Sequence, residues 1–154
     1  MIVVSDTSAI TSLLQIGRVE LLSQIYSDVF IPEAARNELL REHPSIPEFI
    51  RCQSASNRAE VQRLLAELDL GEAEAIILAK ELKADELLID ETAGRRIAAR
   101  EGVNVIGLLG VLLEAKGRGI ISSVRQIAEE LETKAGFRLS NAVKEMFFRE
   151  AGEL

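Results

Sequence analysis

Short, almost wholly apolar runs alternate along this chain with amphipathic stretches, and this alternation is the feature that most restricts its fold. A strand that alternates apolar and polar residues has one face in water, whereas a continuous apolar run is typical of a strand covered on both faces. Runs of the second kind, separated by helices, indicate an α/β fold with a central parallel sheet between two helical layers. We predict strands at Ile2–Val4, Val29–Ile31, Leu87–Ile89 and Val103–Ile106.

Apolar residues at helical spacing, with capping residues and glycines at the ends, predict the segments between the strands. Residues 42–57 hold two prolines and no such pattern, so we expect a loop there, with a short strand around Phe49–Cys52 as the alternative. The sheet then has four or five strands. The predicted helices lie between Ser8 and Gly17, then at about Val19–Ile25, Pro32–Arg41, Asn57–Leu68, Glu72–Leu82, Thr92–Glu101, Leu108–Lys116, Ser123–Lys134 and Asn141–Glu150.

The length of 154 residues suits one domain, residues 1–154, in which the helices of about 108–154 form an extension. No apolar run approaches the roughly 18 residues of a membrane helix. Met1 begins no basic leader, and the single cysteine, Cys52, cannot form an internal disulfide. We therefore expect a cytoplasmic protein that does not enter a membrane.

The net charge of −7 is concentrated in one short segment. Residues 69–91 hold eight acids and two bases, a net of −6, while residues 1–68 carry −3 and residues 92–154 carry +2. Either this segment is a solvated helix face, or its carboxylates face something positive.

Two of the predicted strands end at a carboxylate, Asp6 and Asp90. In open parallel sheets, ligands bind beyond the carboxyl ends of the strands, so this pair marks a candidate site. An aspartate between a strand and a helix is also an ordinary helix cap, which is the alternative for each residue alone.

Three glutamates complete a candidate set: Glu38 inside one predicted helix, and Glu72 and Glu74 at the start of another. Several carboxylates at one sheet edge repel and raise one another's pKa, and a divalent cation relieves that repulsion. Oxygen ligands without His or Cys favour Mg²⁺ or Mn²⁺ over zinc. Such an ion suits phosphodiester hydrolysis, for which the only histidine, His43, is not needed.

Four segments resemble, in order, the motifs of PIN-domain proteins, and together they cover roughly residues 1–110. The tail Gly136-Phe137-Arg138-Leu139-Ser140 is similar to a prokaryotic branch of predicted nucleic-acid-binding PIN domains. The four segments are Ile2-Val3-Val4-Ser5-Asp6-Thr7-Ser8-Ala9, then Ile31-Pro32 with Asn37-Glu38-Leu39, then Leu70-Gly71-Glu72-Ala73-Glu74-Ala75-Ile76, and finally Leu87-Leu88-Ile89-Asp90-Glu91 followed by Arg95-Arg96-Ile97-Ala98 and Gly102.

The resemblance implies a three-layer α/β/α PIN-like fold and Mg²⁺- or Mn²⁺-dependent endoribonuclease activity on RNA. Many relatives are toxins of the VapC type, neutralised by an antitoxin protein. Asp6, Glu38 and Asp90 match acidic positions of the family. Both Glu72 and Glu74 fit the remaining one, with a slight preference for Glu72, which lies 18 residues before Asp90.

Weaker candidates for substrate contacts are Ser8, Arg95 and Arg96. The chain departs from the family at Ile89, where relatives often carry Thr, and at Glu91, where many carry a second Asp. These departures, with the acidic balance, favour as an alternative a catalytically weak or inactive module that binds nucleic acid or protein.

A third class, a phosphate-handling receiver or phosphatase, also places acids at strand ends, but it requires an acid where Ser8 stands. Two apolar stretches, Val103–Leu113 and the helix that carries Met146-Phe147-Phe148, belong either to the core or to a face for a homodimer or an antitoxin.

Overall fold

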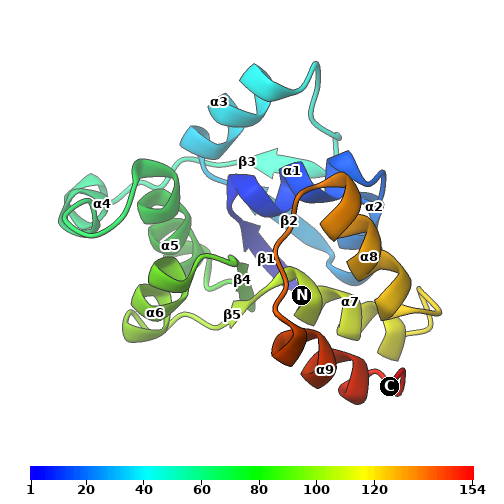
Figure 1. Ribbon diagram of the computed structural model, residues 1–154. Helices are drawn as coiled ribbons and strands as arrows, with labels where there is room; N and C mark the ends of the chain where they lie inside the picture. Colours follow the sequence, from blue (N-terminus) through cyan, green and yellow to red (C-terminus); the bar gives the residue numbers. More distant parts are fainter.

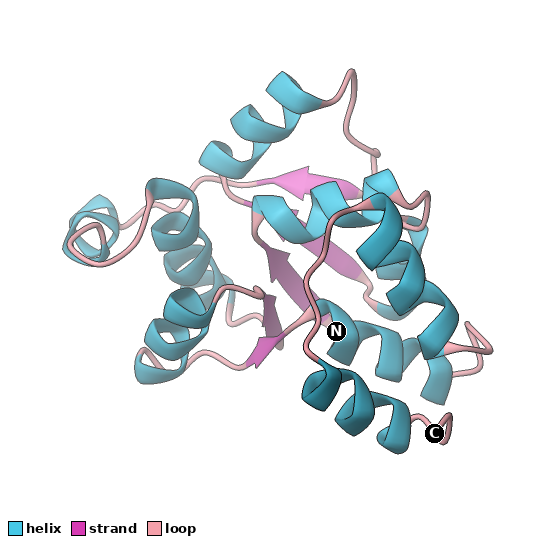
Figure 2. Ribbon diagram, in the orientation of Figure 1, coloured by secondary structure: helices cyan, strands magenta, loops and turns pink.

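The computed structural model describes residues 1–154 and contains a five-stranded sheet in the order β3-β2-β1-β4-β5. Every neighbouring pair is parallel, and β1 lies at the centre (Figures 1 and 2). The predicted α/β class with a parallel sheet is confirmed. The strands are β1 (Ile2–Ser5), β2 (Asp28–Ile31), β3 (Ile50–Cys52), β4 (Glu86–Leu88) and β5 (Val105–Ile106).

Helices cover both faces of the sheet, which gives three layers (Figure 1). One face carries α1, α2, α7, α8 and α9, and the other carries α4, α5 and α6, while α3 packs against both α1 and α5. The helices are α1 (Thr7–Gln15), α2 (Glu20–Ile25), α3 (Glu33–Glu42), α4 (Arg58–Leu64), α5 (Leu70–Leu82), α6 (Thr92–Arg100), α7 (Leu108–Gly117), α8 (Val124–Lys134) and α9 (Asn141–Glu150).

The apolar strands supply side chains to two separate hydrophobic clusters. Val3 and Leu88 belong to the cluster under α1, α2, α7 and α8. Their neighbours Val4 and Leu87 point to the opposite face, into the cluster under α4, α5 and α6. Because successive residues of a strand face opposite sides, a strand covered on both faces must be apolar throughout.

The last three helices share the larger cluster with the central strands. Leu112 of α7, Ala128 of α8 and Phe148 of α9 are buried in it together with Val3 of β1. None of the helices is long and apolar enough to cross a membrane.

The predicted elements differ from the observed ones mainly at their ends. The loop of residues 42–57 does contain a strand, β3, which carries Cys52 in an exposed position at the edge of the sheet. The last strand is shorter than predicted because Val103 lies just after the turn that ends α6, where its N–H donates to the carbonyl oxygen of Ala98 at 2.9 Å. Helix α4 ends at Leu64, and residues 65–67 form a turn.

Candidate active site

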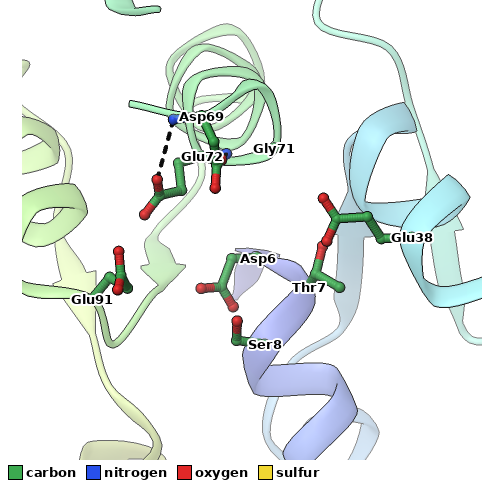
Figure 3. A pocket seen from close by; sticks show the side chains of 8 residues that line it. All are labelled: Asp6, Thr7, Ser8, Glu38, Asp69, Gly71, Glu72 and Glu91. Carbon is green, nitrogen blue, oxygen red and sulfur yellow. Dashed lines mark hydrogen bonds between the residues drawn. The ribbon is translucent and has the colours of Figure 1, made fainter. Parts of the chain in front are cut away.

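A pocket of about 230 Å³ lies at the carboxyl ends of β1 and β4, and no hydrophobic residue lines it. Five of its eight lining residues are acidic, and none is basic (Figure 3). The chain folds so that residues far apart in sequence meet here, because the parallel strands all end at this edge. The lining residues are Asp6, Thr7, Ser8, Glu38, Asp69, Gly71, Glu72 and Glu91.

Asp6 sits between β1 and α1 and is only 7% exposed. Its N–H donates to the carbonyl oxygen of Leu88 at 3.1 Å, and its Oδ1 accepts a hydrogen bond from the N–H of Ala9 at 3.0 Å. Burial raises the pKa of Asp6 to about 7, although the hydrogen bond from Ala9 opposes the shift. The negative charges of Asp90 and Glu72 raise this pKa further.

Glu72 is held by a capping box at the start of α5. Its N–H donates to Oδ1 of Asp69 at 2.8 Å, and its own Oε1 accepts from the N–H of Asp69 at 3.4 Å. Burial, followed by the charge of Asp69, raises the pKa of Glu72 to about 7, and the nearby Glu91 adds to the shift. Two acids with raised pKa values therefore lie in one pocket.

Two glycines let neighbouring backbones approach these acids. A Cβ atom at Gly94 in α6 would stand 3.1 Å from Oε2 of Glu72 and 2.5 Å from Cδ1 of Ile89. A Cβ at Gly71 would stand 3.7 Å from Oε1 of Glu38, which reaches the pocket from α3. The walls of the pocket are formed by α1, α3, α5 and the segment after β4 (Figure 3).

Asp90 lies beside this pocket but does not line it. Both of its carboxylate oxygens accept from the N–H of Leu108 at 3.2 Å, at the N-terminus of α7, where the helix dipole favours a negative charge. Burial raises the pKa of Asp90, although the hydrogen bond from Leu108 and the charge of Arg95 oppose the shift. Its charge is the strongest of those that raise the pKa of Asp6, and the pairing of β1 with β4 places both residues at the same edge of the sheet.

Glu74 points away from the pocket and is 4% exposed. Its Oε1 accepts from the N–H of Ala34 at 2.9 Å, and its Oε2 pairs with Nη2 of Arg58 at 2.8 Å. Glu74 thereby ties α5 to α3 and α4. Of the two glutamates that the sequence leaves open, Glu72 lies in the pocket and Glu74 does not.

The three arginines of α6 differ in their surroundings. Arg95 donates from Nη1 to the carbonyl oxygen of Ile89 at 3.1 Å, and Arg100 pairs with Glu67 at 2.8 Å. Arg96 is exposed and makes no ion pair. None of them lines the acidic pocket, whereas Ser8, the third candidate for substrate contacts, does.

Apart from Gly71, the pocket has three lining residues that the sequence analysis did not name as candidates: Thr7, Asp69 and Glu91. A signal existed for each of them, since Thr7 lies between Asp6 and Ser8, and Glu91 directly follows Asp90. Asp69 caps the helix that carries Glu72, so its position in the site follows from its capping role.

The donor set of the pocket fits a hard divalent cation. As the side chains stand, no group of three or more His, Cys, Asp or Glu residues is arranged to hold a metal ion. The pocket nevertheless offers five carboxylates and two hydroxyls, all of them oxygen donors. Asp6, Glu72 and Glu91 lie around one space in Figure 3, and burial together with neighbouring carboxylates raises the pKa of both Asp6 and Glu72.

A family model described as a PIN domain matches residues 2–153 of the chain. No curated protein and no solved structure matches it significantly. The match spans every element of the sheet and all nine helices.

Proposed function

This chain belongs to the PIN-domain family, whose members are typically nucleases, and we propose that it is a metal-dependent endoribonuclease that hydrolyses RNA phosphodiester bonds. The presence of Asp6 and Glu72 in the same pocket carries the proposal. Both acids have pKa values raised to about 7 in a pocket without a single basic lining residue. Such an arrangement costs stability in the metal-free protein and is relieved by a cation.

The proposed ligands of Mg²⁺ or Mn²⁺ are Asp6, Glu38 and Glu72, which line the pocket, together with Asp90, which lies beside it. When bound, the ion would lower the pKa of an attacking water and offset charge on the leaving oxygen. Because burial raises the pKa of both Asp6 and Glu72, the metal-free carboxyls bind protons more readily than free ones, and ion binding would displace those protons. Ser8 lines the pocket at the start of α1, and its hydroxyl would donate to a phosphate oxygen of the RNA.

A cleavage assay tests this proposal directly. Labelled single-stranded RNA is incubated with the protein and Mn²⁺ or Mg²⁺, with excess EDTA as the metal-free control. We expect cleavage that requires the metal and is lost in Asp6→Asn. Asn keeps the side-chain oxygen that accepts a hydrogen bond from the N–H of Ala9, but it loses the negative charge that would bind the ion. Glu145→Gln is the matched control, since Glu145 is exposed on α9 and pairs only with Arg149. Equal cleavage by Asp6→Asn and the wild type would remove the assignment.

The catalytically weak binding module remains the second candidate, favoured by Ile89. Its side chain is fully buried in the cluster under α5 and α6, so it offers no hydroxyl to the pocket where relatives often have Thr. A ligand that binds only the native state raises the melting temperature, so a Mn²⁺ titration separates the two. A shift without cleavage favours a module with a bound metal, and no shift at millimolar Mn²⁺ favours one without metal.

The finer proposal is that the nuclease is the toxin of a toxin–antitoxin pair. It rests on the resemblance to VapC-type proteins and on the acidic pocket described above. Expression of the wild type should then arrest growth of the host cell, and Asp6→Asn should not. Growth arrest by both proteins at equal expression would exclude a toxic nuclease.

A further inference from the structure

A second cavity, of about 390 Å³, lies next to the acidic pocket at the carboxyl ends of β4 and β5. The segment after β4 separates the two: Glu91 lines the acidic pocket, whereas its sequence neighbours Asp90 and Thr92 line the second cavity. The two cavities therefore lie on either side of the segment 90–92, with Asp90 on the side of the second cavity.

Two aromatic rings form part of the wall of this second cavity. Phe137 follows α8 and Phe147 belongs to α9, and both are half-buried, so each packs on the core and keeps part of its surface free. Six of the eleven lining residues are hydrophobic, in contrast to the acidic pocket, which has none. Aromatic rings at an open apolar cavity suit a flat, unsaturated ligand.

Two polar groups at the same cavity are free to bind a ligand. Arg95 uses Nη1 on the carbonyl oxygen of Ile89 and makes no ion pair, so Nε and Nη2 of its guanidinium stay available. The hydroxyl of Thr92 makes no hydrogen bond within the protein. A donor fork and a hydroxyl therefore line the same cavity as Asp90, and both Nη1 of Arg95 and Oδ1 of Asp90 lie close to Gly107.

We propose that this second cavity binds an unpaired nucleobase of single-stranded RNA, beside the scissile phosphate in the acidic pocket. A nucleobase has flat faces for Phe137 and Phe147, and a polar edge for Thr92 and Arg95. Its attached phosphate would lie on the side toward the acidic pocket, within reach of the positive charge of Arg95, which lines the second cavity. The placement of that phosphate rests on the proposed nuclease function, whereas base binding itself does not.

The wall that carries Phe147 is held in place by a network around Glu153. The carboxylate of Glu153 accepts from Oγ of Ser123 and from the N–H of Val124, both at 2.7 Å, and pairs with Nζ of Lys116 at 2.9 Å. These contacts fix the end of α9 against α7 and α8. The cavity is therefore formed before a ligand arrives, which reduces the entropy cost of binding.

Binding is measured without metal, so that cleavage plays no part. The four nucleoside 5′-monophosphates are titrated into ¹⁵N-labelled protein in EDTA, and amide shifts are followed by NMR. We expect the shifts to centre on Gly107, Gly110 and Val143, which line the cavity. Phe137→Leu and Phe147→Leu keep an apolar side chain but remove the ring, and each should weaken binding about tenfold, the loss of one base–aromatic stack.

Phe49→Leu is the matched control, because Phe49 is also half-buried but lies before β3, outside this cavity. Melting curves show which variants are folded. A second experiment needs no variant: a single abasic position at the cleavage site should weaken RNA binding to the wild type about tenfold. Shifts that map elsewhere, or folded Phe137→Leu and Phe147→Leu proteins that bind like Phe49→Leu, would overturn the proposal.

The test also separates this proposal from the proposed nuclease function. Asp6→Asn should still bind the nucleotides, because Asp6 does not line the second cavity. Nucleotide binding without any metal-dependent cleavage would leave the base site standing and remove the nuclease. If Phe137→Leu cleaves RNA with the same KM as the wild type, and an abasic position has no effect, the nuclease function stands and the base site is removed.

Discussion

The backbone N–H of Asp6 donates a hydrogen bond to the carbonyl oxygen of Leu88, 3.1 Å away. This bond extends the pairing of β1 with β4 by one residue beyond Ser5. The sheet therefore places Asp6 and Asp90, two residues past Leu88, at the same edge. Because the core under the strands holds the backbone in place, the effect of the Asp90 charge on Asp6 cannot be relieved by moving the strands apart.

The first prediction is that Asp6→Asn stabilises the metal-free protein at high pH. The pKa of Asp6 is raised to about 7 in the fold, so the folded state disfavours the carboxylate. Relative to the carboxylate, the protonated side chain of Asp6 stabilises the fold. This contribution is fully present below the unfolded pKa of about 3.9 and is lost as pH rises through 7. At pH 8 in EDTA we expect Asn to raise the unfolding free energy by roughly 2–4 kcal/mol, measured by urea denaturation.

The difference should shrink as pH falls from 7 toward 4, because Asp6 is then protonated in the folded wild type. Glu145→Gln, on the exposed surface of α9, should show no comparable pH dependence. A wild-type protein more stable than Asp6→Asn at pH 8 would mean that the site carries no electrostatic strain.

The second prediction distinguishes Glu72 from Glu74. Glu72→Gln should leave the protein folded and remove most of the rise in melting temperature that Mn²⁺ produces, because Glu72 lies in the acidic pocket. Glu74→Gln should lower the unfolding free energy by roughly 1–3 kcal/mol, because it removes the buried charge that pairs with Arg58, yet keep the response to Mn²⁺. The opposite pattern would assign the pocket role to Glu74.

Much of the fold follows from local pattern. The apolar runs predict strands covered on both faces, and Val3 and Val4 do point into different clusters. The placement of Asp6 follows in the same way, because a strand that ends at an aspartate before a helix puts that acid at the carboxyl edge of the sheet.

Local pattern did not separate Glu72 from Glu74, and only the spacing to Asp90 gave a slight preference for Glu72. Residues that are two positions apart on a helix, such as Glu72 and Glu74, point in directions about 200° apart. Only one of the two can therefore face a given pocket. Which one does so depends on Ala34 and Arg58, which belong to α3 and α4 and which no local pattern links to Glu74. The second cavity could not be predicted from the sequence for the same reason, since Phe137 and Phe147 come together only through the packing of the last helices.

The third prediction concerns the close contact at Gly107. A Cβ there would stand 2.6 Å from Oδ1 of Asp90 and 2.9 Å from Nη1 of Arg95. Gly107→Ala should therefore displace Asp90 from the N-terminus of α7, lowering the unfolding free energy by roughly 1–3 kcal/mol. Gly117→Ala in the same helix is the control, because nothing lies within 4 Å of its Cβ position, and it should be neutral or slightly stabilising.

The last prediction concerns Glu153, whose side chain is 14% exposed. Burial favours its neutral form, but hydrogen bonds from Ser123, Lys116 and the start of α8 outweigh it and hold the pKa of Glu153 at about 2. A lowered pKa means that Glu153 stabilises the fold above its unfolded value of about 4.3, and that this contribution is lost as pH falls toward 2.

Glu153→Gln should accordingly lower the unfolding free energy by roughly 1–2 kcal/mol at pH 7 and by progressively less between pH 5 and pH 2. Hydrogen exchange locates the effect: the amides of α9 should lose protection in the variant at pH 7, while those of β1 and α5 keep theirs, because Glu153 ties α9 to α7 and α8 and does not contact the sheet. A loss of protection spread evenly over the chain would show that Glu153 supports the fold as a whole. Equal stability of both proteins at pH 7 would show that the network contributes nothing.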